Sequence, residues 1–160
     1  MKVIILIVSF LLEGVISNFV TINGYLAPLF TLVALIMICP FFENSADYYK
    51  YAFFTGLAYD LIYTDTIIFH AIIFCFMAFI IIRLNLVLSD NFINALIILA
   101  LSIVFYRVIT YGLLVFINSI HFEIVALGYS ILKSLILNLL YGMIMFVVIK
   151  KVPKRRRYFD

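Results

Sequence analysis

The sequence predicts an all-α integral membrane protein with about six transmembrane helices in one compact bundle. Its 160 residues are 68% hydrophobic and only 12% charged, whereas a soluble chain is roughly half apolar and about a quarter charged. Six spans of about 20 residues would use about 120 residues, which leaves too few for a soluble domain. These numbers exclude a soluble enzyme joined to an anchor, and they exclude a nucleic-acid-binding module.

Apolar runs separated by short polar breaks give the order of the spans. They are predicted over residues 3–19, 25–42, 48–64, 66–87, 92–117 and 122–149. Turn-forming pairs such as Asn23-Gly24 mark the breaks. Pro28 lies in the first turns of the second span, where a missing N–H matters least. Because Glu13-Gly14 interrupts the first span and no cleavage site follows it, we interpret that span as an uncleaved helix.

Positive charge gives the orientation, because cytoplasmic loops are enriched in Lys and Arg. With both termini inside, nine basic residues are cytoplasmic, while the outer loops near 20–24, 64–66 and 118–122 contain none. We therefore expect residues 1–150 to form the transmembrane domain and residues 151–160 a short basic cytoplasmic tail. The tail and Lys150, which precedes it, are predicted to anchor the topology and to attract anionic lipid, with about 1 kcal/mol of binding energy per basic residue. The anchor residues are Lys150, Lys151, Lys154, Arg155, Arg156 and Arg157; the other three of the nine are Lys2, Lys50 and Arg83.

Four ionisable residues lie inside the predicted spans, namely Glu13, Asp60, Arg107 and Lys133. An isolated charge at the centre of a bilayer costs about 2.5–3.5 kcal/mol on insertion scales. The four charges cancel in sign, and their predicted depths let the long basic side chains reach the acids. We therefore expect a buried, charge-balanced cluster that joins spans one, three, five and six. Which acid would meet which base is left open by the sequence.

Small or polar residues recur every four positions in the same four spans, so each of these spans has one polar or small face. The sets are Ser9, Glu13 and Ser17; Ala52, Gly56 and Asp60; Ser102, Tyr106 and Thr110; and Ser130, Ser134, Asn138 and Gly142. Such faces allow close helix packing and hydrogen bonds between helices, so Gly56 and Asn138 join the predicted cluster. Spans two and four lack this pattern and are expected to face lipid more fully. The cluster has three interpretations. It could be structural and fix the order and register of the helices, it could form a substrate or partner site, or it could form a proton or ion pathway.

Catalytic and cofactor-binding motifs are weak throughout the sequence. It contains no G-x-S-x-G, H-E-x-x-H or P-loop pattern. The two cysteines, Cys39 and Cys75, lie at different predicted depths, so they predict small buried side chains and neither a disulfide nor a metal site. We expect no enzyme activity, no cofactor and no bound metal.

The segment 53–61, F-F-T-G-L-A-Y-D-L, carries a family resemblance. Its G-L-x-x-D pattern in the third hydrophobic stretch resembles the MreD family of rod-shape-determining proteins, as do the length, the number of spans and the basic C-terminus. Gly56 and Asp60 are the residues of this chain that match the glycine and the aspartate of the family pattern.

The resemblance to MreD also implies a function and a set of partners. The protein would be a non-enzymatic, multi-pass scaffold of the cell-elongation complex in the bacterial cytoplasmic membrane. It would bind MreC and, through MreC, the MreB filaments, RodA and a class B penicillin-binding transpeptidase, and so support side-wall peptidoglycan synthesis and cell shape. No nucleic-acid partner is expected.

A second function from another class is also consistent with the sequence. The substrate-binding subunit of an energy-coupling-factor vitamin transporter is similarly small and has about six spans. It would place polar ligands in the outer half of the bundle, where the predicted cluster lies. A rise in melting temperature with a vitamin would favour the transporter, whereas co-purification with MreC would favour the scaffold.

Overall fold

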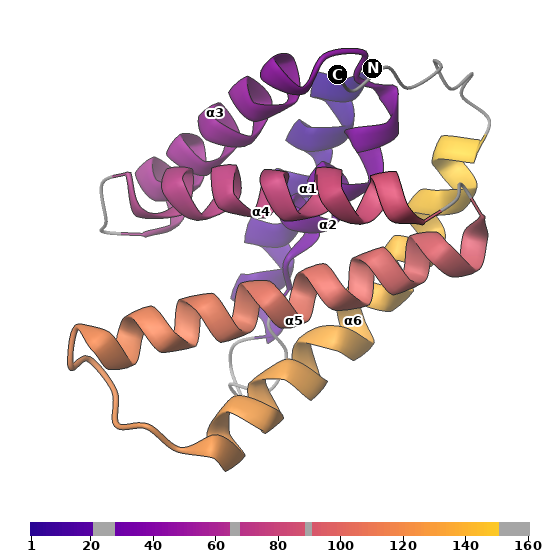
Figure 1. Cartoon of the computed structure of the whole chain (residues 1–160). Coiled ribbons are helices and arrows are strands. Elements are labelled where there is room, and N and C mark those ends of the chain that lie inside the picture. Colours follow the sequence, from indigo (N-terminus) through magenta and orange to yellow (C-terminus); the bar gives the residue numbers. More distant parts are fainter. Residues whose placement is uncertain (21–27, 65–67, 89–90, 151–160) are drawn as a thin grey trace.

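The computed structural model describes residues 1–20, 28–64, 68–88 and 91–150, and within these ranges the regular structure is helical. In these described ranges, six α-helices and a short 3₁₀ helix follow one another (Figure 1). They are α1 (Lys2–Val20), α2 (Phe30–Ile38), η2 (Cys39–Phe41), α3 (Ser45–Tyr63), α4 (Phe69–Val87), α5 (Phe92–Phe116) and α6 (Ile124–Lys150). The predicted all-α fold is confirmed.

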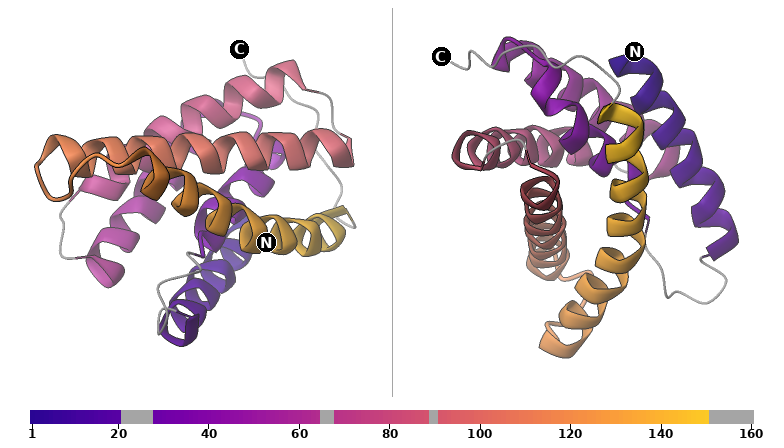
Figure 2. Two further views of the ribbon diagram at one scale, coloured as in Figure 1. Left: turned by 90° about the horizontal axis from the view of Figure 1, so that it is seen from below. Right: turned by 90° about the vertical axis from the view of Figure 1, so that its right-hand side faces the viewer.

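Three of the described helices are long and apolar enough to cross a membrane, namely α4, α5 and α6. α1 and α3 have 19 residues each. The number of six spans and the cytoplasmic placement of both termini stay predictions. In the right-hand view of Figure 2, α1 begins and α6 ends toward the same end of the molecule, as an even number of passes requires.

α2 differs from the second predicted span in length and surroundings. Together with η2 it covers Phe30–Phe41, and 12 residues of α-helix would reach only about 18 Å against a hydrocarbon core of about 30 Å. Residues 25–27 of that predicted span lie outside the described residues. All nine residues of α2 are buried, because the helix contacts α1, α4, α5 and α6.

The expectation that spans two and four face lipid more fully was therefore wrong. α2 is the centre of the bundle. Half of an 18-residue apolar segment of α4 is buried, compared with 28% and 22% of the corresponding segments of α5 and α6. The reason is chemical: α2 is apolar on every side, and a helix with that pattern fits a protein core as well as it fits lipid. The buried core combines α2 with one face of α4 and with parts of α3 and α5, including Tyr48, Met77 and Leu99.

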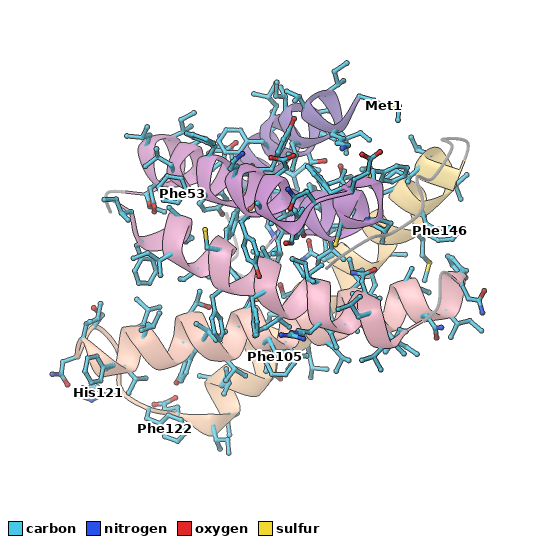
Figure 3. All side chains as sticks on the ribbon, turned by 45° about the horizontal axis from the view of Figure 1, so that its top comes forward. Met1, Phe53, Phe105, His121, Phe122 and Phe146 are labelled. Carbon is cyan, nitrogen blue, oxygen red and sulfur yellow. The ribbon has the colours of Figure 1, made fainter. Side chains whose placement is uncertain are left out.

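The outside of the bundle is covered with large apolar side chains. Phe53 and Phe105, for example, project from α3 and α5 and are 38% and 44% exposed (Figure 3). An exposed apolar surface of this extent suits lipid or protein partners, because in water it would favour aggregation.

Local signals explain where two helices begin and end. α3 starts after Asn44, whose side chain accepts a hydrogen bond from the Ala46 N–H at 2.9 Å, as a helix N-cap does. η2 contains Pro40 and precedes the extended Phe42, so the chain turns there from α2 into α3. α2 and α4 lack such a signal, because the residues before them are Leu29 and Ile68.

Candidate functional site

Gly56 brings α3 into close contact with the start of α4. A Cβ atom at this position would lie 2.5 Å from the Cα of Ala71 and 2.5 Å from the carbonyl oxygen of His70. Both neighbours are backbone atoms, which cannot rotate away as a side chain can. Glycine is therefore the residue that allows the first turn of α4 to rest on α3.

Asp60 lies one helical turn beyond Gly56 and accepts the backbone N–H groups at the start of α4. The N–H of His70 lies 3.0 and 2.9 Å from its two carboxylate oxygens, and the N–H of Ala71 lies 3.2 Å from Oδ2. A helix start carries partial positive charge and unpaired N–H groups. The side chain of Asp60, which is 1% exposed, thus caps α4 from the neighbouring helix.

This cap replaces one that the local sequence does not supply. The residue before α4 is Ile68, which makes no side-chain cap hydrogen bond and has a φ of 71°. A β-branched residue rarely adopts such a backbone angle. Contacts from α3 therefore hold a helix start that its own flanking sequence would not favour.

Two further side chains contact Asp60. The Nδ1 atom of His70 lies 2.8 Å from Oδ1 of Asp60, and these atoms form an ion pair when the imidazole is protonated. The hydroxyl of Thr64 donates to the same oxygen at 3.2 Å. The sequence alone gives no sign of this contact, because no local pattern relates His70 to an acid ten residues earlier.

Glu13 performs a similar role at the start of α2. Its Oε2 accepts the Thr31 N–H at 2.8 Å, and its Oε1 accepts the Tyr59 hydroxyl at 2.8 Å. The Glu13 side chain is 2% exposed, and the local N-cap residue, Leu29, makes no side-chain cap hydrogen bond. Both buried acids of the predicted cluster therefore receive N–H groups from the first turn of another helix.

Tyr59 connects the two caps. Its hydroxyl donates a hydrogen bond to Glu13, while the centre of its ring lies 4.7 Å from the centre of the His70 imidazole. Tyr59 lies beside Asp60 in the sequence, where no motif indicates a role for it. Only the tertiary contact between α1 and α3 places its hydroxyl at Glu13.

Asn138 and Arg107 form a third part of the interior. The Oδ1 of Asn138 accepts the Leu29 N–H at 2.7 Å, so α6 also holds the entry to α2. The Nδ2 of Asn138 donates to the Ser134 carbonyl, and the Nε and Nη2 atoms of Arg107 both lie 3.1 Å from the Ser134 hydroxyl. The structure thus brings Arg107, Ser134 and Asn138 together.

Lys133 lies beside this group on α6 and is half-buried. Its Nζ lies 5.0 Å from the centre of the Tyr129 ring, within the range of a cation–π contact. A direct ion pair between an acid and Arg107 or Lys133 stays a prediction. Of the predicted anchor residues, Lys150 ends α6, and Lys151, Lys154, Arg155, Arg156 and Arg157 lie outside the described residues.

The predicted polar and small faces point largely into the bundle. Their buried members are Ser9, Glu13, Ala52, Gly56, Asp60, Ser102, Tyr106, Ser134, Asn138 and Gly142. Ser9, for example, lies 2.8 Å from the Tyr141 hydroxyl and thereby joins α1 to α6. Among the residues that the structure describes, no group of three or more His, Cys, Asp or Glu side chains could hold a metal ion.

These features define a helical membrane protein whose interior is organised by carboxylate and amide caps on neighbouring helices. A comparison with protein families matches residues 1–155 to MreD, described as rod shape-determining protein MreD. The chain therefore belongs to the MreD family, and the resemblance seen in the sequence is confirmed. Neither a curated protein nor a solved structure matches it significantly.

Family membership gives the protein a role in determining rod shape, and it identifies the chain as a membrane protein. Of the two functions expected from the sequence, it supports the shape-determining role over the vitamin-transporter subunit. The Gly56–Asp60 segment that carries the resemblance is the segment that positions α4. The family pattern thus coincides with a defined packing contact.

Proposed function

We propose that the protein is a non-enzymatic scaffold of the cell-elongation complex, embedded as a multi-pass protein in the bacterial cytoplasmic membrane. It binds MreC and, through MreC, associates with MreB, RodA and a class B penicillin-binding transpeptidase. In this way it supports side-wall peptidoglycan synthesis. The observation that carries the proposal is the family match over residues 1–155.

The structure suggests how such a scaffold works. The buried caps at Glu13, Asp60 and Asn138 fix the helices relative to one another, so the outer faces keep a defined spacing. α5 and α6 have the smallest buried share among the three membrane-length helices, which leaves most of their surface for other components. We expect the partners to contact these outer faces, while the buried polar caps keep the helices in fixed positions.

Depletion in the native rod-shaped cell tests the role in cell shape. Cells that lose the protein should become round, because side-wall synthesis then lacks one of its membrane components. Expression of the wild-type chain from a second locus should restore rods. Rod-shaped growth after complete depletion would contradict the proposal.

Co-purification tests the choice of partner. MreC should be retained by the tagged chain in mild detergent, and an unrelated multi-pass protein with the same tag should retain none. Absence of MreC from the purified chain under conditions that preserve other membrane complexes would contradict direct binding.

A further inference from the structure

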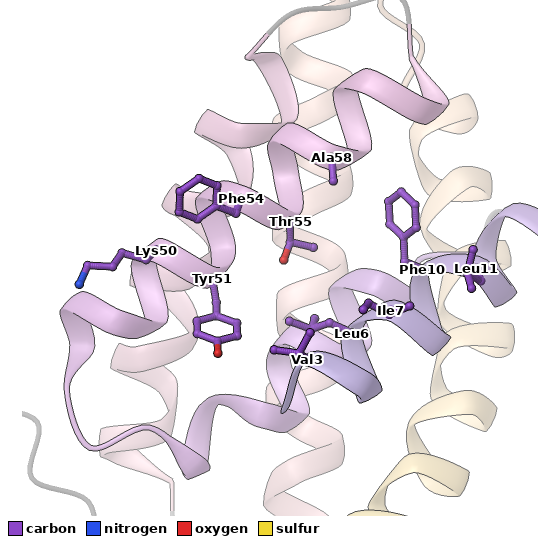
Figure 4. Close-up of a pocket in the computed structure, with 10 residues that line it drawn as sticks. All are labelled: Val3, Leu6, Ile7, Phe10, Leu11, Lys50, Tyr51, Phe54, Thr55 and Ala58. Atoms are coloured by element: carbon purple, nitrogen blue, oxygen red, sulfur yellow. The ribbon is translucent and has the colours of Figure 1, made fainter. Parts of the chain in front are cut away.

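An apolar groove of about 560 Å³ lies between α1 and α3 (Figure 4). We call it the α1–α3 groove. One wall is formed by α1 residues that include Val3, Ile7 and Leu11, and the other by α3 residues that include Tyr51, Phe54 and Ala58. The two helices face each other across the groove in Figure 4, and Phe54 is 65% exposed at its edge.

Hydrogen bonds between α1 and α3 close one end of the groove. Beyond Ala58, the Tyr59 hydroxyl bonds to Glu13, and the Tyr63 hydroxyl donates to the carbonyl oxygen of Phe10. The other end lies at Val3 and Lys50, near the N-terminal ends of both helices. The groove therefore ends at these contacts, and it is open along its outer side and at the N-terminal ends of the two helices.

The length of the groove indicates what fits in it. From Val3 to Leu11, and from Lys50 to Ala58, each wall covers eight residue steps, or about 12 Å of helix. One leaflet is half of a hydrocarbon core of about 30 Å. An acyl chain ends within its leaflet, whereas a partner helix would continue across the bilayer and meet the closed end.

Basic side chains lie at the open end. Lys50 lines the groove with its side chain 67% exposed, and its Nζ lies 2.9 Å from Asp47. Lys2 lies 3.9 Å from the centre of the Phe42 ring, which in turn packs against Tyr51. An exposed pair such as Lys50–Asp47 contributes little energy, so Lys50 can exchange Asp47 for a phosphate group.

We propose that the α1–α3 groove binds one acyl chain of an anionic phospholipid, with the lipid phosphate beside Lys50. The lipid comes from the leaflet at the N-terminal ends of α1 and α3. The chain fills the space that the apolar walls leave open. This site is separate from the scaffold role proposed above and does not depend on it.

Lipid retention by the purified full-length chain tests the proposal. After exchange into detergent containing phosphatidylglycerol or phosphatidylcholine, native mass spectrometry should show one retained phosphatidylglycerol in preference to phosphatidylcholine. Ala58→Phe should abolish this retention by filling the groove, whereas Ala126→Phe on an exposed part of α6 should leave it intact. Lys50→Gln should weaken retention about fivefold, the effect of removing one basic residue near anionic lipid, and Arg83→Gln should not.

A photoreactive phenylalanine in place of Phe54 keeps the proposal testable if Ala58→Phe does not fold. Irradiation in the membrane should attach a phospholipid to the chain at this position. Three results would overturn the proposal: equal retention of the two lipids, unchanged retention in folded Ala58→Phe, or a cross-link from Phe54 to a partner protein or a second copy in place of lipid.

Discussion

The Asp60 carboxylate lies where the first turn of α4 concentrates positive partial charge. Backbone N–H groups of His70 and Ala71 surround it at 2.9–3.2 Å, and the imidazole of His70 adds a further contact at 2.8 Å. Such an environment stabilises a negative charge that would otherwise be expensive inside a membrane protein. At the scale of the residue, the capping of a neighbouring helix accounts for the burial of an aspartate.

Replacing Asp60 with alanine should therefore destabilise the protein. The N–H groups of His70 and Ala71 would lose their acceptor inside the bundle, which costs about 1–3 kcal/mol. The free energy of unfolding in detergent measures this loss. Asp47→Ala is the matched control, because Asp47 lies on the same helix with its side chain 56% exposed, and it should change stability by less than about 0.5 kcal/mol. Equal effects of the two substitutions would contradict the capping role.

Gly56→Ala tests the close approach of α3 to α4. The added methyl group would meet backbone atoms at 2.5 Å. The backbone shifts that such overpacking forces should lower the free energy of unfolding by about 1–3 kcal/mol. Gly112→Ala provides the control, since nothing lies within 4 Å of a Cβ there; it should be neutral or stabilise helix α5 by up to about 1 kcal/mol. Thermal unfolding of both variants distinguishes them, and a Gly56→Ala variant as stable as the wild type would refute the contact.

At the scale of the element, α2 depends on its neighbours for its start. Glu13 on α1 accepts the N–H of Thr31, and Asn138 on α6 accepts the N–H of Leu29. Neither contact is local, since 18 and 109 residues separate the partners. A short apolar helix at the centre of the bundle is thus fixed by polar groups on α1 and α6.

Asn138→Ala should weaken this arrangement. Loss of the acceptor for the Leu29 N–H, a buried backbone group, is expected to cost about 1–3 kcal/mol. Asn91→Ala is a suitable comparison, because Asn91 is exposed and makes no side-chain cap hydrogen bond at the start of α5. Chemical denaturation reports both values. The account of α2 would be contradicted if the two asparagine variants lost the same stability.

The sequence predicted the helices well and their partners less well. Hydrophobic run length located α5 and α6 within about two residues, because the polar breaks around them are clear. The steps of four placed Gly56, Asp60 and Asn138 on buried faces, as observed. The central position of α2 was missed, because a helix that is apolar on all sides carries no signal that separates a protein core from lipid. The roles of Tyr59 and His70 depend on tertiary packing, which no local pattern encodes.

At the scale of the whole molecule, the bundle has an apolar core that contains a few hydrogen-bonded polar groups, and it has an apolar exterior. The buried polar side chains include Ser9, Ser134, Asn138, Glu13 and Asp60. Large aliphatic and aromatic side chains cover the surface. This distribution suits a membrane scaffold, because helix order is fixed inside and the outer faces remain available to lipid and to partners. Family membership links that architecture to rod shape.

The topology can be tested with single cysteines in a chain whose native Cys39 and Cys75 have been replaced by alanine. Phe122→Cys lies between α5 and α6 at a position that is 65% exposed, on the predicted outer side. An impermeant thiol reagent should label it in intact protoplasts, whereas Asp47→Cys should react only after permeabilisation. Labelling of Asp47→Cys in intact protoplasts would contradict the predicted orientation.

The central claim is that the buried Asp60 carboxylate acts by capping the start of α4, while its pairing with Arg107 or Lys133 stays a prediction. The most direct measurement is the free energy of unfolding of Asp60→Lys alone and combined with Arg107→Asp or Lys133→Asp, analysed as double-mutant cycles. The capping account predicts that neither second substitution restores stability, because a lysine cannot accept the N–H groups of His70 and Ala71. Substantial recovery in either double variant would contradict the account and would show that Asp60 acts through an ion pair.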